Sequence, residues 1–277
     1  TRLEKYAACA FAHFMEFGLQ IRERDQYELK AADMGTVMHE ALEKFSKKLQ
    51  ENGETWKTVT DDTRDRLIEE CVEETMADYG NTIFQSSSRN QYRIIRVKRI
   101  LKRTVWALQQ QIRQGEFEPG EFEVSFSMED SLSAINIDLS EHEKMRLRGR
   151  IDRVDLCETD DKVYVKIIDY KTGNTSLDLV ALYYGLQLQL AVYLDAAGEL
   201  EQKKHPGKQV EPAGVFYYHI DDPMLDQEED ETDEAWGRRM LKALRMDGLV
   251  NADRKVVELL DRVLEDGTTS DVIPVGK

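Results

Sequence analysis

The chain has 277 residues, 41% of them hydrophobic, which suits one large domain or a core with a helical annex. Its 54 acidic and 38 basic residues give a net charge of −16, which argues against a basic nucleic-acid-binding surface over the whole molecule. No stretch approaches the roughly 20 apolar residues that span a bilayer, so we expect no membrane association. No signal peptide is visible, and a start at Thr1 instead of Met suggests a fragment of a longer protein.

The charge is unevenly distributed along the sequence. Much of the acid lies in the run 227–234, which is typical of an exposed loop. The segment 89–113 carries eight basic residues and no acidic one: Arg89, Arg93, Arg96, Lys98, Arg99, Lys102, Arg103 and Arg113. Local charge therefore decides what the protein binds, and a metal site itself needs carboxylates.

The three cysteines, Cys9, Cys71 and Cys157, are odd in number and far apart. This pattern predicts no disulfide framework and indicates a reducing, cytoplasmic location. The sequence has no CxxC motif or Cys/His cluster, so we expect no self-contained zinc site.

Apolar residues at helical spacing predict four helices in residues 1–118. The first covers 1–24 and could end at Gly18. The second is capped by Asp33, carries a clean apolar stripe and stops near Asn52-Gly53. Two more are expected at about 61–79 and 89–114. We interpret 1–118 as a helical region.

Strand signals begin after Pro119-Gly120, where apolar and polar residues alternate. Further strands are expected at 146–156, 162–170 and 213–220, with a hairpin turn at 158–161 between the first two. Helices are expected at 177–197 and over most of 232–265. This order predicts an α/β core in 119–277 that forms one composite domain with the helical region.

The strand Val163–Lys171 ends in two charges on a buried face. Side chains alternate, so Asp169 and Lys171 share a face with three β-branched residues. If the preceding strand pairs antiparallel, Asp152 can approach Asp169, and two such carboxylates repel unless a cation neutralises them. Their oxygen ligands suit Mg²⁺ or Mn²⁺. The simpler alternative is a surface salt bridge, for which Asp-x-Lys alone is sufficient.

Two other segments supply residues of the kinds that such a site uses. His39 lies at the edge of the helical stripe, with Gly35 one turn before it, and an imidazole nitrogen can ligate a metal. Gln189 and Tyr193 are four residues apart and share a helix face, from which they can contact phosphate or brace the lysine. The ordinary alternatives are a packing histidine and an amphipathic helix.

In this order, the set resembles the RecB-type branch of the PD-(D/E)XK nucleases: His39, then Gly149-Arg-Ile-Asp152, Asp169-Tyr-Lys171, and Gln189 with Tyr193. The resemblance covers most of the chain. It is most specific to the nuclease domain at the C-terminal end of AddB-like subunits of bacterial AddAB helicase–nucleases, whose first cysteine segment resembles 1–14. It implies a restriction-endonuclease-like α/β core, a mixed central sheet flanked by helices.

The resemblance also implies roles for individual residues. His39, Asp152 and Asp169 would bind Mg²⁺ or Mn²⁺ together with the Tyr170 carbonyl. Lys171 would position the attacking water or stabilise charge on the phosphate. The residues in supporting roles are Gln189 and Tyr193 (site or DNA), Arg150 and Arg153 (phosphate of DNA), and either Glu121 or Glu123 (an additional carboxylate).

In the AddB-like family the first cysteine joins three others near the C-terminal end to hold a [4Fe–4S] cluster. Here Cys9 matches that cysteine, but no cysteine follows Cys157. Either the later cysteines lie outside this chain or this member lacks the cluster. We expect no cluster in residues 1–277, and a brown, iron-containing preparation would contradict this.

The leading hypothesis is a Mg²⁺-dependent DNA exonuclease domain that acts on a single strand or duplex end. A helicase–nuclease partner subunit would feed it during double-strand-break repair. One alternative is a catalytically silent DNA-binding or scaffolding module of the same fold. Another is a stand-alone exonuclease of phage or CRISPR-associated type.

Overall fold

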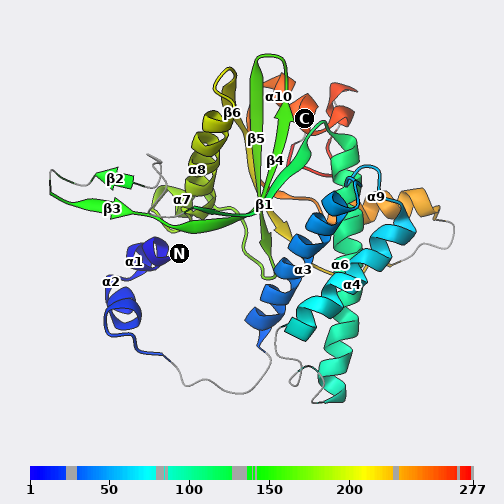
Figure 1. Ribbon diagram of the computed structural model, residues 1–277, viewed down its shortest axis with the longest axis horizontal. Coiled ribbons are helices and arrows are strands. Elements are labelled where there is room, and N and C mark those ends of the chain that lie inside the picture. Colours follow the sequence, from blue (N-terminus) through cyan, green and yellow to red (C-terminus); the bar gives the residue numbers. More distant parts are fainter. Residues whose placement is uncertain are drawn as a thin grey trace.

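A computed structural model describes residues 1–22, 30–78, 84, 87–126, 136–138, 140, 142–226, 231–266 and 269–275. Among these residues a five-stranded sheet has helices on both faces (Figure 1). The predicted α/β class, with a mixed sheet flanked by helices behind an N-terminal helical region, is confirmed.

The sheet has the strand order β1-β4-β5-β6-β7. Its strands are β1 (Glu118–Phe126), β4 (Gly149–Glu158), β5 (Lys162–Lys171), β6 (Gln209–His219) and β7 (Asp247–Val250). The pair β5/β6 is parallel and the other pairs are antiparallel. A separate small sheet joins β2 (Asn136–Asp138) to β3 (Lys144–Arg146). The parallel pair places the carboxyl ends of β5 and β6 at one edge, where ligands bind in many α/β proteins.

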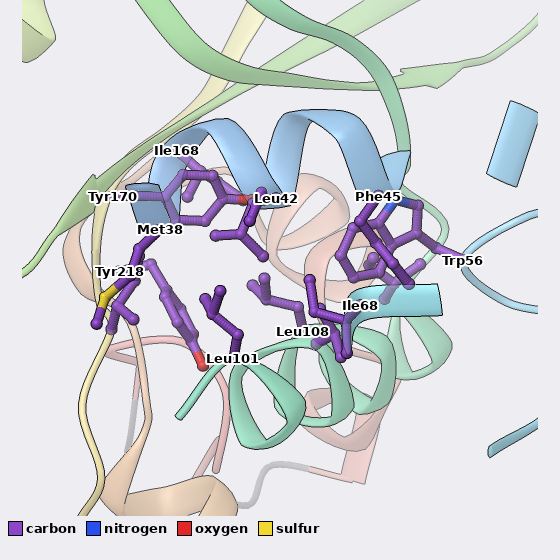
Figure 2. Close-up of a cluster of buried hydrophobic side chains, with 14 of the residues drawn as sticks. Met38, Leu42, Phe45, Trp56, Ile68, Leu101, Leu108, Ile168, Tyr170 and Tyr218 are labelled. Carbon is purple, nitrogen blue, oxygen red and sulfur yellow. The ribbon is translucent and has the colours of Figure 1, made fainter. Parts of the chain in front are cut away.

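One face of the sheet packs against three long helices, α3 (Ala31–Glu51), α4 (Asp61–Asp78) and α6 (Ser88–Gln114). Their apolar stripes form one large core with the sheet, in which Phe45 and Leu101 lie in the same cluster as Ile168 and Tyr218 (Figure 2). This core joins side chains from the ranges 1–118 and 119–277. Burial of a shared face explains why the two regions pack so closely.

The opposite face is covered by α8 (Gln189–Lys204), which buries Leu190 and Tyr193 against Ile167 of β5. Short helices complete the described fold: α1 (Arg2–Ala8), α2 (Ala10–His13), a π-helix (Phe14–Gly18), α7 (Leu179–Tyr183), α9 (Asp233–Ala243), α10 (Arg254–Leu260) and a 3₁₀-helix (Arg262–Asp266). In Figure 1, α1 and α2 lie beyond the same side of the sheet as α7 and α8.

The structure differs from the sequence prediction in several elements. The helix expected at 177–197 is divided, because the chain turns at Gly185, whose φ is +74°, before α8 begins. The mostly helical 232–265 contains the edge strand β7. Asp33 is not the cap of α3: Lys30 precedes the helix, and its N–H donates to the Asp33 carboxylate. Residues 227–230 of the predicted acidic loop lie outside the described residues, and Asp233 and Glu234 begin α9.

Of the helices that the structure describes, none is both long enough and apolar enough to cross a lipid bilayer.

Candidate active site

Asp152 and Asp169 come together where β4 meets the end of β5. Arg153 pairs with Ile168, which places Asp152 and Asp169 one position further along the same antiparallel ladder. The N–H of Tyr170 donates a 2.8 Å hydrogen bond to Asp152 Oδ2. The predicted antiparallel approach of these strands is therefore confirmed, and it brings Asp152 beside the Asp-x-Lys segment.

His39 reaches this carboxylate from α3. Its Nδ1 atom lies 3.3 Å from Asp152 Oδ2, and its ring packs edge-on against Tyr170 with 5.8 Å between centroids. Gly35, one turn earlier, lets the helix come close, since a Cβ at that position would lie 3.1 Å from Thr172 Oγ1. A larger side chain at residue 35 would push α3, and His39 with it, away from the site.

Glu123 is the third member of this group. His39, Glu123 and Asp152 each offer a ligand atom, and these atoms lie within 4.8 Å of one another. The flanking pairs of β1 and β4 place Glu123 opposite Asp152. Glu123 has a φ of +51°, a left-handed conformation that is rare for a residue other than glycine and that concentrates at functional sites.

Sequence reasoning left open which glutamate, Glu121 or Glu123, joins the site. In the structure the Glu121 carboxylate forms an ion pair with Lys204 on the surface, away from this group. The position of Glu123 opposite Asp152 follows from the register of β1, which the sequence did not supply. Knowledge of that pairing is the signal that could have selected Glu123.

Asp169 and Lys171 form a second group with Gln189 and Tyr193. Lys171 Nζ lies 2.5 Å from Asp169 Oδ2 and donates to Gln189 Oε1 at 3.2 Å. The Gln189 amide donates to Asp169 Oδ1 at 2.9 Å and to the Tyr193 hydroxyl at 3.1 Å. Gln189 therefore holds both charged groups of the Asp-x-Lys segment in place from the opposite face of the sheet.

Two contacts fix the helix that carries Gln189. Glu4 Oε1 in α1 accepts hydrogen bonds from the N–H groups of Leu188 and Gln189, at 2.7 and 3.1 Å, where α8 begins. Gly149 lets Tyr193 pack on β4, since a Cβ at residue 149 would lie 3.0 Å from Tyr193 Cε1. Nothing in the sequence pointed to Glu4, because it lies 185 residues from its partner Gln189.

The site is short of positive charge. Burial and the nearby Asp152 raise the pKa of Glu123 to about 7 and that of Asp169 to about 6. Burial lowers the pKa of His39, but hydrogen bonding and attraction to Asp152 outweigh it and raise the pKa overall. Oxygen donors with one imidazole, crowded enough to hold protons, fit a divalent cation.

The two arginines expected to contact phosphate have different environments. Arg150 is 58% exposed and forms an ion pair with Glu123 at the edge of the site. Arg153 is instead fully buried: its guanidinium pairs with Asp155 and lies over the Trp56 ring at 5.0 Å. A side chain that no solvent reaches cannot contact phosphate in this structure, so we do not keep Arg153 among the phosphate-binding candidates.

Cys9 is exposed and lies at the start of α2, whereas Cys71 and Cys157 are buried in the core. Much of the basic segment is neutralised within the fold. Four of its side chains pair with carboxylates of other segments (Lys98, Arg99, Lys102 and Arg103), and Arg113 donates to backbone carbonyls. The basic character of α6 is therefore concentrated near its N-terminal end.

Mn²⁺ binding is expected to release protons and to tighten as the pH rises. A cation displaces the protons held by Glu123, Asp169 and His39, since all three have raised pKa values in its absence. Between pH 5.5 and 7 the apparent affinity should rise by about tenfold or more per pH unit, and it should level off above the highest of these pKa values. Calorimetry in buffers of different ionisation enthalpy measures both quantities.

The matched variants are Glu123→Gln and Glu121→Gln. The first removes a proton-holding ligand, so we expect weaker Mn²⁺ binding and fewer protons released. The second changes a surface ion pair and should leave both unchanged. Equal behaviour of the two variants would exclude Glu123 from the metal site.

Comparison with known proteins agrees with this geometry. Residues 1–270 match the family described as the PD-(D/E)XK nuclease superfamily. The chain is similar to three proteins, each named as one of the subunits of an ATP-dependent helicase/deoxyribonuclease. The protein of Lachnoclostridium phytofermentans is 48% identical over 99% of this chain, that of Alkaliphilus metalliredigens 41% over 100%, and that of Clostridioides difficile 40% over 100%.

The chain spans only 23–24% of the length of these relatives. The resemblance to the nuclease domain of AddB-like subunits, inferred from four short motifs, is confirmed by these matches. Because the family match extends over nearly its whole length, the chain belongs to the PD-(D/E)XK nuclease superfamily.

Proposed function

We propose that the chain is a Mg²⁺- or Mn²⁺-dependent DNA nuclease domain that hydrolyses phosphodiester bonds. The observation that carries the proposal is the group His39, Glu123 and Asp152, with ligand atoms within 4.8 Å of one another beside the Asp169–Lys171 pair. The relatives are named as deoxyribonuclease subunits, which supports DNA as the substrate.

In this proposal His39, Glu123 and Asp152 hold the cation, with Asp169 and the Tyr170 carbonyl as further ligands. The cation supplies positive charge to the phosphate under attack. Lys171 keeps its ammonium near that phosphate, because Asp169 and Gln189 bind it from two sides. There it orients the attacking water or stabilises developing negative charge. Arg150, exposed beside Glu123, contacts a phosphate of the DNA, while Gln189 and Tyr193 support the site.

The wider context is part of the same proposal. The relatives are named as helicase subunits, so a helicase partner would supply a DNA end or a single strand for exonucleolytic degradation in break repair. Cys9 would ligate a [4Fe–4S] cluster only together with cysteines outside residues 1–277. We place the protein in the cytoplasm because the three cysteines are free thiols. Residues 1–118 and 119–277 act as one composite domain.

The test is divalent-cation-dependent degradation of linear single-stranded DNA by the full polypeptide that contains residues 1–277. Asp169→Ala should reduce the rate by about a hundredfold or more, since it removes a carboxylate that neighbours both the metal group and Lys171. Asp160→Ala, in the exposed turn between β4 and β5, is the matched control and should keep the parent rate. Full activity of Asp169→Ala contradicts the mechanism.

The same experiment separates the alternative functions. A silent module of this fold would neither cleave DNA nor bind Mn²⁺ at millimolar concentration. A stand-alone exonuclease would degrade DNA at full rate without a helicase partner or ATP.

A further inference from the structure

Two cavities flank the candidate active site, one on each side of it. The first, of about 320 Å³, is lined by Gly35 and Met38 of α3, by the α6 residues around Arg96, and by Thr172 just past β5. The second, of about 580 Å³, is lined by Gln189 and Tyr193 of α8 and by the segment 146–148. They share no lining residue.

The site residues lie between these cavities. Gln189, in the wall of the second cavity, bonds directly to Asp169 and Lys171. Lys171 is followed by Thr172 in the wall of the first cavity, and Thr172 packs close to Gly35, one turn before His39. A line from one cavity to the other therefore crosses the carboxylates and the lysine of the site.

Both cavities are basic, in a chain whose net charge is −16. The first has Lys30, Arg93 and Arg96 in its wall, with Asp221 as its single acidic residue. The second has Arg2, Arg146 and Arg148 and no acidic residue. Six basic residues against one acidic residue reverse the balance of the whole molecule, so these walls suit an anionic ligand.

The rest of each wall is largely apolar. Met34, Val97 and Ile100 contribute to the first cavity, and Leu147, Val192 and Phe126 to the second. Beside the first cavity, Tyr92 of α6 is 63% exposed. Apolar and aromatic surface with arginines at hand binds the faces of unstacked bases and the backbone phosphates of single strands, whereas a duplex keeps its base faces inside the stack.

We propose that the two cavities hold the nucleotides on either side of the scissile phosphate, so that one nucleic-acid strand runs from cavity to cavity across the site. The inference rests on the proposed nuclease function and adds the path of the strand. Arg96 marks one side of that path and Arg148 the other. Both are exposed, so their guanidinium groups are accessible to a phosphate.

The first test uses charge removal in the full polypeptide with single-stranded oligonucleotides. Arg96→Ala and Arg148→Ala should each raise KM by about three- to tenfold, leave kcat within about twofold, and lower the salt dependence of binding by about 0.7 in the log–log slope. The matched controls are Lys98→Ala, which lies two residues further along α6 and pairs with Glu73, and Lys162→Ala, which pairs with Glu211 at the other end of β5.

The second test maps the path directly. Arg96→Cys and Arg148→Cys are combined with oligonucleotides that carry a thiol on one chosen phosphate, in a Lys171→Ala background to slow cleavage. The two cysteines should form disulfides with phosphates on opposite sides of the cleavage position. Crosslinking to the same side, or no more than Lys98→Cys gives, overturns the proposed path.

The outcomes separate this inference from the proposed function. If the parent protein cleaves DNA but the alanine variants match their controls, the cavities do not hold the strand and the nuclease function stands. If the parent cleaves no DNA with any divalent cation, the nuclease function itself fails. Binding that changes equally for single-stranded and duplex oligonucleotides contradicts the single-strand path.

Discussion

Lys171→Ala is expected to lower kcat for DNA hydrolysis by about a hundred- to a thousandfold while Mn²⁺ binding persists. The Lys171 ammonium contacts Asp169 Oδ2 and Gln189 Oε1, and it also lies 5.2 Å from the centre of the Tyr217 ring. These contacts leave it partly exposed, at 22%, toward the site. The metal group His39, Glu123 and Asp152 does not include it, so its loss removes a charge from the reaction rather than a ligand.

The measurement combines single-turnover rates at saturating DNA with Mn²⁺ titration. Lys162→Ala, on the same strand but paired with Glu211, controls for the loss of a β5 lysine and should keep the parent values. A parent-like kcat in Lys171→Ala would remove the lysine from the chemistry. Loss of Mn²⁺ binding together with kcat would make it a structural support of the metal site instead.

Asp155→Ala is expected to lower the free energy of unfolding by about 3–5 kcal/mol. Asp155 is fully buried and is bound by the Arg153 guanidinium and, at 2.7 Å, by Lys166 Nζ. Its removal leaves two buried cations without their shared counterion. Burial raises the pKa of Asp155, but attraction to Arg153 and Lys166 outweighs it and sets the pKa below the usual value. This stabilisation is therefore complete above the usual carboxyl pKa and is lost as the pH falls through the lowered one.

Thermal and urea unfolding at neutral pH measure the effect, and Tm should fall by more than about 6 °C. Glu211→Ala, which breaks the partly exposed pair with Lys162, is the control and should cost less than about 1 kcal/mol. A destabilisation of Asp155→Ala no larger than that of Glu211→Ala would show that the buried network contributes no more than a surface pair. Because Arg153 also contacts the Tyr170 hydroxyl at 3.5 Å, loss of the network should loosen the strand end at the site.

The sequence predicted the features that depend on local periodicity. The long helices, the β4–β5 hairpin and the shared face of Asp169 and Lys171 all follow from apolar spacing of 3.6 or 2 residues. The end of α3 at Asn52 also agrees with the prediction. Residues brought together by ladder register alone were less accessible, which is why Glu121 and Glu123 could not be told apart.

Arg153 shows a second limit of sequence reasoning. In the sequence it flanks Asp152 in the same way as Arg150, and both resemble phosphate ligands. Their fates differ because alternation along β4 turns Arg153 toward the helical face, where Asp155 and Lys166 neutralise it. A buried ion network leaves no distinctive spacing in the sequence, since its members belong to different strands. The short strand β7 was missed for a related reason: its four residues carry no usable period.

The left-handed backbone of Glu123 has an evolutionary consequence. Holding a side chain with a Cβ in that region costs about 1–2 kcal/mol, which glycine or asparagine would largely avoid. A protein selected only for folding would therefore favour either residue at position 123 over a glutamate with a pKa near 7. The chain gives up some stability at one point of β1 so that a carboxylate can face Asp152. A homologue that has lost its chemistry would be free to recover that stability by a single substitution there.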